Sequence, residues 1–299
     1  MRNAALVLSS GGARGCAHIG AIKALEKSGF KITSVAGTSM GALVGGIYST
    51  GELSAFEEWI SGLDLMEVLK LTDFSISSKG LVKGKKVFEK IREIVPDRKI
   101  EDLLIPFCAV ATDILNGTEV VFSEGDLFEA IRASISIPTV FQPYRIGDNY
   151  LVDGGLLNPI PVNRVKRTND DLLIVVNVSA PIPYEKKEAV EEHHFYDRYS
   201  DQIETIKGKL GSIFPSLNRD DDNDDDEPVE IGIFDIPNKS IGTMMRRISD
   251  LTLEMHKPDL LINLPKESYG TYDFYKAKEI IEEGETAAIN ALREGGFIS

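Results

Sequence analysis

The sequences AALVLSSGGARG at residues 4–15 and SVAGTSMGALVGGIY at residues 34–48 decide the fold of this chain. Each begins with a short apolar run that is typical of a buried strand, passes through glycine-containing turn residues, and leads into a helical pattern. We predict strands at residues 4–9 and 34–37, with a helix after each. Such alternation predicts an α/β fold with a mainly parallel central sheet, covered by helices on both faces. In such folds the functional loops lie at the carboxyl ends of the strands.

Later segments extend this core. Asn116-Gly117 lies between two apolar runs and predicts a β-hairpin with a type I′ turn, which adds antiparallel pairing. Residues 172–178 form an almost uninterrupted apolar run, which is typical of an interior strand. We therefore predict a core domain at residues 1–180, completed by a final strand and helix at residues 258–299.

The segment between these parts, residues 181–257, has a different composition, with charged helical stretches around an acidic run. The acidic run, at about residues 219–228, contains Asp220, Asp221, Asp222, Asp224, Asp225, Asp226 and Glu227. Like charges repel one another and bury little apolar surface, so we predict a disordered loop within a helical insertion or lid. Calcium binding is disfavoured because the run lacks the glycine of an EF-hand loop.

The composition excludes several classes of protein. A net charge of −14 over 299 residues repels phosphate backbones and argues against a nucleic-acid partner. Cys16 and Cys108 belong to no cluster with metal-ligand spacing, so we predict reduced core thiols, no metal and no cofactor. No apolar run is long enough for a secretory leader or a membrane span, so we expect a cytoplasmic protein.

Gly37 and Gly41 flank Ser39 in the pattern Gly-x-Ser-x-Gly, which is the nucleophile elbow of many serine hydrolases. In that motif, small residues allow a tight turn between a strand and a helix, and the turn exposes the serine hydroxyl. The apolar strand predicted before Ser39 and the helix of small residues after it supply the required context. We therefore predict that Ser39 is a nucleophile rather than an ordinary turn serine.

The loop at residues 10–15 leaves backbone amides unpaired at a helix N-terminus, which favours negative charge. A dinucleotide site would also need an acidic residue at the end of the second strand, and a P-loop would need Lys followed by Ser or Thr. The sequence has neither. We therefore predict an oxyanion hole, in which the amides of Gly11 and Gly12 bind the oxygen of an ester carbonyl.

Asp153 is the best candidate for the base that Ser39 needs. It ends a predicted strand, precedes Gly154 and Gly155, and is expected to emerge at the same edge of the sheet as Ser39. Asp113 also ends a strand, but the hairpin after it accounts for its polarity. The histidines have weaker contexts, in the first helix, in the charged insertion or at a helix end: His18, His193, His194 and His256.

The glycine loop at residues 10–15, the serine turn at residues 37–41 and Asp153-Gly154-Gly155, in this order, resemble the motifs of the patatin-like phospholipases. The resemblance implies a serine acyl hydrolase that cleaves fatty-acyl esters of phospholipids or lysophospholipids through a Ser39–Asp153 dyad, without a histidine. It implies that Asp153 takes the serine proton, that Gly11 and Gly12 bind the oxyanion, and that water hydrolyses the acyl-enzyme. Where the family often has a third glycine, this chain has Ser10. The remaining motif residues would support this machinery: Ala13, Arg14, Gly15, Gly37, Gly41, Gly154 and Gly155.

Residues 4–179 carry the resemblance, and other interpretations stay open beside it. The order Ser39, Asp153, His256 also suits an α/β-hydrolase triad, although that fold places several strands before its serine. An acyltransferase would use the same acyl-enzyme, and a non-catalytic acyl-lipid binding protein would keep the fold without turnover. The basic stretch at residues 79–92 is a hypothesis for peripheral contact with the inner surface of a membrane, with a solvated helix face as the alternative.

Overall fold

The computed structural model of the protein describes four stretches of the chain: residues 1–71, 84–138, 140–184 and 235–299. The chain divides into two compact units, one made of Met1–Pro183 with Met244–Ser299 and the other of Tyr184–Thr243. The predicted acidic loop, His193 and His194 lie outside the described residues. The lid role of residues 181–257 therefore stays a prediction.

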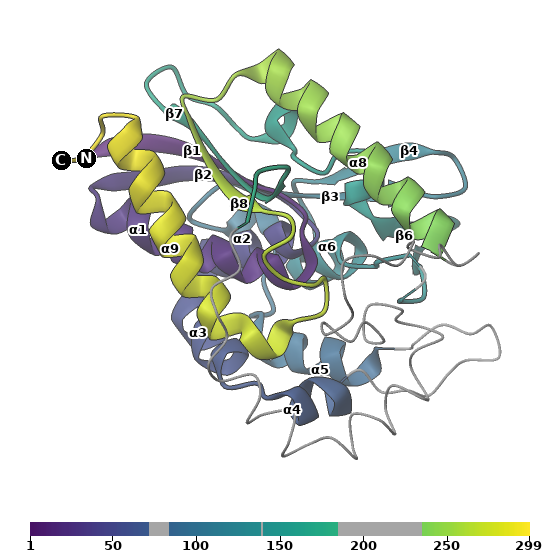
Figure 1. Ribbon diagram of the computed structural model, residues 1–299. Coiled ribbons are helices and arrows are strands. Elements are labelled where there is room, and N and C mark those ends of the chain that lie inside the picture. The colour runs from purple at the N-terminus through teal and green to yellow at the C-terminus, as the bar shows by residue number, and fades with distance from the viewer. Residues whose placement is uncertain (72–83, 139, 185–234) are drawn as a thin grey trace, which may run out of the picture. The chain divides into compact units, whose positions relative to one another are not determined.

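An eight-stranded sheet forms the centre of the first unit, in the order β5-β6-β3-β2-β1-β7-β8, with β4 paired to β3 (Figure 1). The strands are β1 (Arg2–Leu8), β2 (Phe30–Thr38), β3 (Phe107–Asp113), β4 (Thr118–Phe122), β5 (Tyr144–Ile146), β6 (Asn149–Asp153), β7 (Leu172–Ala180) and β8 (Leu260–Pro265). The pairs that join β3, β2, β1, β7 and β8 are parallel, whereas β4, β5 and β6 pair antiparallel with their neighbours. The predicted mainly parallel sheet is thus confirmed.

Helices lie on both faces of this sheet, as predicted (Figure 1). The helices are α1 (Ala17–Lys27), α2 (Met40–Thr50), α3 (Leu53–Ser61), α4 (Leu65–Leu71), α5 (Lys85–Ile94), α6 (Leu127–Ser134), α8 (Asp235–His256) and α9 (Ala277–Glu294). Successive side chains of β1 point to opposite faces of the sheet and so contact different helix layers. Leu6 and Leu8 pack with α1, α2 and α9, whereas Ala5 and Val7 pack in a smaller cluster that includes Leu253 of α8.

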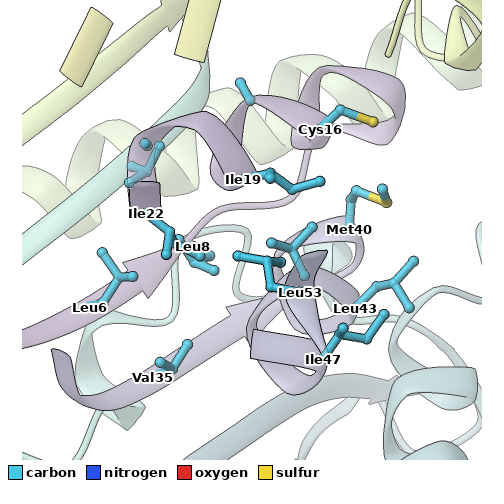
Figure 2. Packing of buried hydrophobic residues seen from close by; sticks show 14 of the residues in the cluster. Leu6, Leu8, Cys16, Ile19, Ile22, Val35, Met40, Leu43, Ile47 and Leu53 are labelled. Atoms are coloured by element: carbon cyan, nitrogen blue, oxygen red, sulfur yellow. The ribbon is translucent and has the colours of Figure 1, made fainter. Parts of the chain in front are cut away.

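The larger core fills the space between the sheet and the layer of α1, α2 and α9. Figure 2 shows this core, with Leu6 and Leu8 of β1, Ile19 of α1 and Ile47 of α2 among its members, all of them fully buried. Small residues allow these elements to approach closely. A Cβ atom on Gly20 of α1 would overlap with the backbone of α9. The glycines within these helices therefore serve packing, which offsets their poor helix propensity.

Cys16 and Cys108 are free, buried thiols. Burial raises the pKa of each to about 12, so both stay protonated near neutral pH. A protonated thiol is a poor nucleophile and a poor metal ligand. Both cysteines therefore behave as small apolar core residues.

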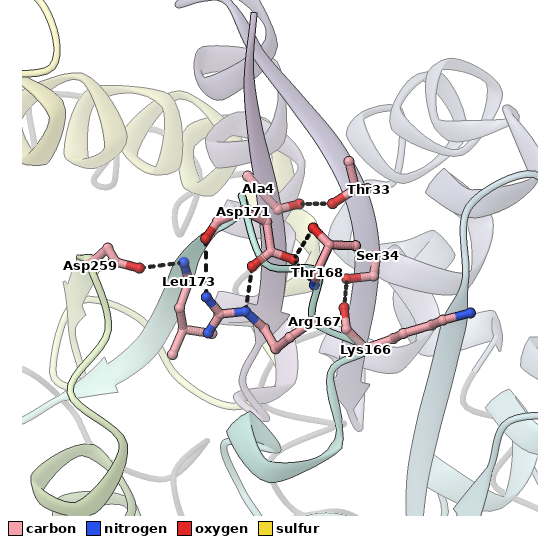
Figure 3. A network of polar contacts seen from close by, with 9 residues as sticks. All are labelled: Ala4, Thr33, Ser34, Lys166, Arg167, Thr168, Asp171, Leu173 and Asp259. Atoms are coloured by element: carbon pink, nitrogen blue, oxygen red, sulfur yellow. Dashed lines mark hydrogen bonds and ion pairs between the residues drawn. The ribbon is translucent and has the colours of Figure 1, made fainter.

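A polar network joins the strands near their amino ends (Figure 3). The carboxylate of Asp171 accepts hydrogen bonds from the Arg167 guanidinium at 2.5 Å and from the Thr168 amide at 2.6 Å. The Leu173 amide donates to the carboxylate of Asp259 at 2.7 Å, which ties the start of β7 to the residue before β8. Ser39 follows β2 at the opposite end of the sheet, away from this network.

The predicted hairpin between β3 and β4 is confirmed, but its predicted type I′ turn is wrong. That turn needs positive φ at both central residues, and here Gly117 has a φ of 65° while Asn116 does not have a positive φ. Instead, the Asp113 carboxylate caps a longer turn. It accepts hydrogen bonds from the Leu115 amide at 3.0 Å and from the Asn116 side chain at 2.6 Å. As expected, the hairpin accounts for the polarity of Asp113.

No helix in the described part of the chain combines the length and the apolar character that crossing a bilayer demands.

Candidate active site

Ser39 lies at the sharp turn between β2 and α2, with φ 56° and ψ −125°. It is the one non-glycine residue of the described chain with positive φ. Such a conformation costs on the order of 1–3 kcal/mol and persists only where the surroundings hold it. A Cβ atom on Gly37 would overlap with the backbone of Gly41, and one on Gly41 would overlap with the carbonyl group of Leu8. Steric overlap therefore requires glycine at both positions of the motif.

Ser134, at the end of α6, holds this turn in place. Its hydroxyl accepts a hydrogen bond from the Ser39 amide at 2.9 Å and donates to the Val110 carbonyl oxygen at 2.6 Å. The side chain is fully buried. Sequence reasoning missed this residue, because a single serine within a helical pattern gives no signal and the contact spans 95 positions.

Asp153 reaches Ser39 along one edge of β3. That edge pairs first with β2, where Thr38 opposes Val110, and then with β6, where Asp153 opposes the next residue, Ala111. β2 and β6 share this edge because β4 pairs with the opposite edge of β3, over residues 109–113. The two strands therefore end facing each other. The expected proximity to Ser39 is present, although it arises from an antiparallel strand and not from neighbouring parallel ends.

The carboxylate of Asp153 is buried, with 6% of the residue exposed. Burial raises its pKa to about 6, and hydrogen bonds from the Ser39 side chain and the Gly155 amide act in the opposite direction. The Gly155 amide donates to Oδ1 at 2.7 Å. A Cβ atom on Gly154 would overlap with the carbonyl group of Val110, so this glycine lets the chain turn against β3. The site thus places a carboxylate of raised basicity against a serine hydroxyl.

The glycine loop contains a 3-10 turn, Gly12–Cys16, and α1 starts directly after it at Ala17. The Ala13 amide donates to the Thr271 carbonyl oxygen at 2.9 Å, and the Ser10 amide donates to that of Pro159 at 2.9 Å. In contrast, the amides of Gly11 and Gly12, within the described residues, have no hydrogen-bond acceptor.

The glycine loop also lies beside the serine turn. A Cβ atom on Gly15 would overlap with the side chain of Met40, the first residue of α2, and one on Gly155 would lie 3.2 Å from Ser10 Oγ. Free amides and the Ser39–Asp153 pair therefore belong to one site.

Arg14 binds carbonyl oxygens of the glycine loop and of the segment after β8. Its guanidinium donates to the carbonyl oxygens of Lys266 at 2.6 Å, Tyr269 at 3.2 Å and Gly11 at 3.2 Å. The side chain thus ties the glycine loop to the segment after β8. Its role in supporting the motif is structural.

Two further segments contact the glycines of the site. Thr271, in the segment after β8, lies 2.6 Å from the Cβ position of Gly12, and the methyl group of Met245 on α8 lies 2.7 Å from the Cβ position of Gly155. Only 3% of Ser39 is exposed.

His18 and His256 are the histidines within the described residues, and neither forms a hydrogen bond with Asp153 there. His18 is fully buried, and burial lowers its pKa to about 4. Its hydrogen bond with the Ser9 carbonyl oxygen, at 2.9 Å, acts on the pKa in the opposite direction. It supports the strand that leads into the glycine loop. His256 is exposed at the end of α8. Within the described residues, no three His, Cys, Asp or Glu side chains gather as a metal site requires.

The basic stretch at residues 79–92 lies partly outside the described residues, which include its members on α5. Lys85 pairs with Glu89 at 3.5 Å, and Lys90 pairs with Glu93 at 2.6 Å. These cations have local partners, as on a solvated helix face. Membrane contact at this stretch stays a prediction.

Comparisons with known proteins place this geometry in context. Residues 6–165, which include Ser39 and Asp153, match the family described as patatin-like phospholipase. An uncharacterized NTE family protein of Mycobacterium tuberculosis is 33% identical over 96% of this chain and 91% of its own length. Patatin-like phospholipase domain-containing protein 6 of Mus musculus is 34% identical over 59% of this chain and 13% of that protein. The crystal structure of VipD from Legionella pneumophila covers 98% of this chain and 67% of its own, with 13% identity and a TM-score of 0.42.

Proposed function

This chain belongs to the patatin-like phospholipase family, and from that membership we propose that it is a serine acyl hydrolase that cleaves fatty-acyl esters of phospholipids or lysophospholipids. Membership itself supports lipid acyl hydrolysis in general. The observation that carries the finer proposal is the buried contact between the Ser39 side chain and the Asp153 carboxylate. A strained serine held against a carboxylate, beside free amides, suits attack on a carbonyl carbon.

The proposed reaction has two halves. In the first, Ser39 Oγ bonds to the ester carbonyl carbon while its proton passes to Asp153. The tetrahedral intermediate then collapses and breaks the bond to the leaving alcohol, which takes the proton from Asp153. In the second, Asp153 removes a proton from water as the water oxygen attacks the acyl carbon. The fatty acid leaves, and Ser39 regains its proton.

The amides of Gly11 and Gly12 are the proposed donors to the oxyanion that forms in each half. Both are free of other acceptors in the described chain, and the loop that carries them lies beside the serine turn. Preorganised donors of this kind are worth about 10²–10³ in kcat each. The Ser39 amide is excluded from this role because it donates to Ser134.

Activity should depend on the ionisation of Asp153. Its pKa of about 6 means that the carboxylate is protonated, and unable to accept the serine proton, at lower pH. We therefore expect kcat/KM for a soluble short-chain ester to rise about tenfold per pH unit below pH 6 and to level off above it. A p-nitrophenyl butyrate assay across this range measures the profile. A limb near pH 4 would show that the carboxyl group has an ordinary pKa or that the base lies elsewhere.

Ser134 is proposed as a positioning residue, and its replacement tests this role. Ser134→Ala leaves the buried Ser39 amide without its acceptor, which should lower the free energy of unfolding by about 1–3 kcal/mol. Misplacement of the hydroxyl should also lower kcat by roughly 10–100-fold, with a smaller change in KM. Urea denaturation and ester kinetics measure the two effects.

Ser49→Ala is the matched control for Ser134→Ala. Ser49 is also buried, but its hydroxyl donates to the Gly45 carbonyl oxygen at 2.8 Å within α2 instead of binding the Ser39 amide. We expect Ser49→Ala to leave kcat near that of wild type. If both variants lose stability and neither loses kcat, Ser134 has only a structural role.

Two alternatives use the same site. An acyltransferase would pass the acyl group from Ser39 to an alcohol or thiol, so product analysis with added glycerol distinguishes transfer from hydrolysis. A triad with His256 is disfavoured by the direct Ser39–Asp153 contact, which leaves no imidazole between the two groups. A non-catalytic lipid-binding role predicts that no lipid ester is cleaved at all.

A further inference from the structure

Three exposed apolar side chains stand together at one end of the sheet. Ile114 and Leu115 lie in the turn between β3 and β4 and are 49% and 68% exposed, and Tyr150 on β6 is 39% exposed. The Ile114 amide donates to the Tyr150 carbonyl oxygen at 3.0 Å, which joins the turn to β6. We call Ile114, Leu115 and Tyr150 the apolar tip. Turns at such positions normally carry polar residues, so two adjacent aliphatic side chains need an explanation.

The turn is built to hold these side chains outward. Asp113 accepts hydrogen bonds from the Leu115 amide and the Asn116 side chain, and its carbonyl oxygen accepts from the Gly117 amide at 2.9 Å. Each backbone amide of residues 114–117 thus has an acceptor, either on Asp113 or on β6. A rigid turn loses little conformational entropy when its side chains are buried by a partner.

The apolar tip lies beyond the carboxyl end of β3, the end at which the proposed site also lies. On β3, Ala111 opposes Asp153, and Ile114 lies three residues farther along. Tyr150 lies three residues before Asp153 on β6. At about 3.3 Å per residue, the tip therefore projects about 10 Å beyond the carboxylate.

An ion pair of opposite charges flanks the tip. Arg145 and Asp148, on the β5–β6 hairpin, pair with each other at 3.6 Å, and the Arg145 guanidinium lies 5.6 Å from the centre of the Tyr150 ring. The tip itself carries no charged side chain. The surface therefore suits a partner that is apolar beneath a polar, electrically neutral layer. Tyrosine, with an apolar ring and a polar hydroxyl, is typical of such boundaries.

We propose that the apolar tip inserts into the interface of a zwitterionic phospholipid surface and so brings the site to its substrate. The proposal rests on the proposed function, which makes lipid the substrate. Apolar faces of interfacial proteins enter a bilayer by about 5–10 Å, to the boundary between headgroups and acyl chains. A site about 10 Å behind the tip then lies at the level of the headgroups, close to the ester bonds.

The test compares exposed apolar residues at the two opposite ends of β3. The double variant Ile114→Ser with Leu115→Ser removes the aliphatic part of the tip. Leu104→Ser is the matched control, because Leu104 is 95% exposed but lies before the start of β3, at the other end of the strand. Both changes are made in the full chain carrying Ser39→Ala, so that binding is measured without turnover. Melting temperatures establish that each variant is folded.

Binding to vesicles of phosphatidylcholine alone should weaken by about tenfold or more in the tip variant and stay unchanged in Leu104→Ser. Added salt should have little effect, because no charge is paired. With an active serine, the rate on vesicles should fall relative to the rate on p-nitrophenyl butyrate.

Three results would overturn the proposal. The tip variant could bind phosphatidylcholine as well as the control does. Binding could instead require phosphatidylglycerol and disappear in high salt, which would assign docking to cations elsewhere. Wild type could self-associate through the tip, with sedimentation showing a dimer that the tip variant abolishes. Failure of the proposed function looks different, because ester hydrolysis would then be absent or insensitive to Ser39→Ala whatever the vesicles bind.

Discussion

Ser39→Ala is expected to reduce hydrolysis of lipid and soluble esters to the assay background, a loss of up to about 10⁶-fold. The substitution removes the oxygen that forms the acyl-enzyme and leaves the Cβ atom in place. The change removes no apolar volume from the core but takes one hydrogen bond from the buried Asp153 carboxylate, so the variant should stay folded with a modestly lower melting temperature. Ester kinetics and a thermal melt measure both effects. A fluorophosphonate probe should label wild type at Ser39 and leave the variant unlabelled.

His256→Ala is the control that separates a dyad from a triad. His256 is exposed at the end of α8, and we expect its replacement to leave turnover within a few-fold of wild type. A loss comparable to that of Ser39→Ala would revive the triad. Substantial turnover by pure Ser39→Ala protein would show that another group is the nucleophile.

Asp153→Asn is expected to impair catalysis and stabilise the fold at the same time. The amide keeps the shape of the carboxylate but cannot take the serine proton, so kcat should fall by about 10²–10⁴ with a much smaller change in KM. Stability should move in the opposite direction. The buried carboxylate has a pKa of about 6, raised from 3.8, so the folded protein disfavours the ionised form. The uncharged amide removes that cost.

The sign of the stability effect follows from linkage. A folded pKa above the unfolded one means that Asp153 contributes its full stability below about pH 4 and loses it as pH rises through about 6. Asp153→Asn should therefore match wild type near pH 4 and exceed it at pH 8, by up to about 3 kcal/mol. Urea denaturation at the two pH values measures the difference. Lower stability of the variant at pH 8 would contradict the destabilisation of the ionised carboxylate by burial. Unchanged kcat would contradict its role as the base.

The sequence alone determined the features that arise from local chemistry. Apolar runs near residues 4–9 and 172–178 specified buried strands, because an uninterrupted apolar segment has to be covered on both faces. Gly37 and Gly41 marked the serine turn, because only a missing Cβ atom permits the backbone contacts found there. The type of the turn between β3 and β4 was predicted wrongly. There, hydrogen bonds donated to the Asp113 carboxylate decide the local geometry.

Tertiary structure alone decided how the site is assembled. The sequence placed Asp153 at a strand end, but only the pairing along β3 shows that β6 runs antiparallel and ends facing β2. The bond from the Ser39 amide to Ser134 spans 95 positions, and that from Arg14 to Lys266 spans 252. Neither contact has a local pattern, because its geometry depends on how the whole sheet brings distant segments together. The motifs therefore named the candidate site residues, whereas the fold set their burial and the raised pKa of Asp153.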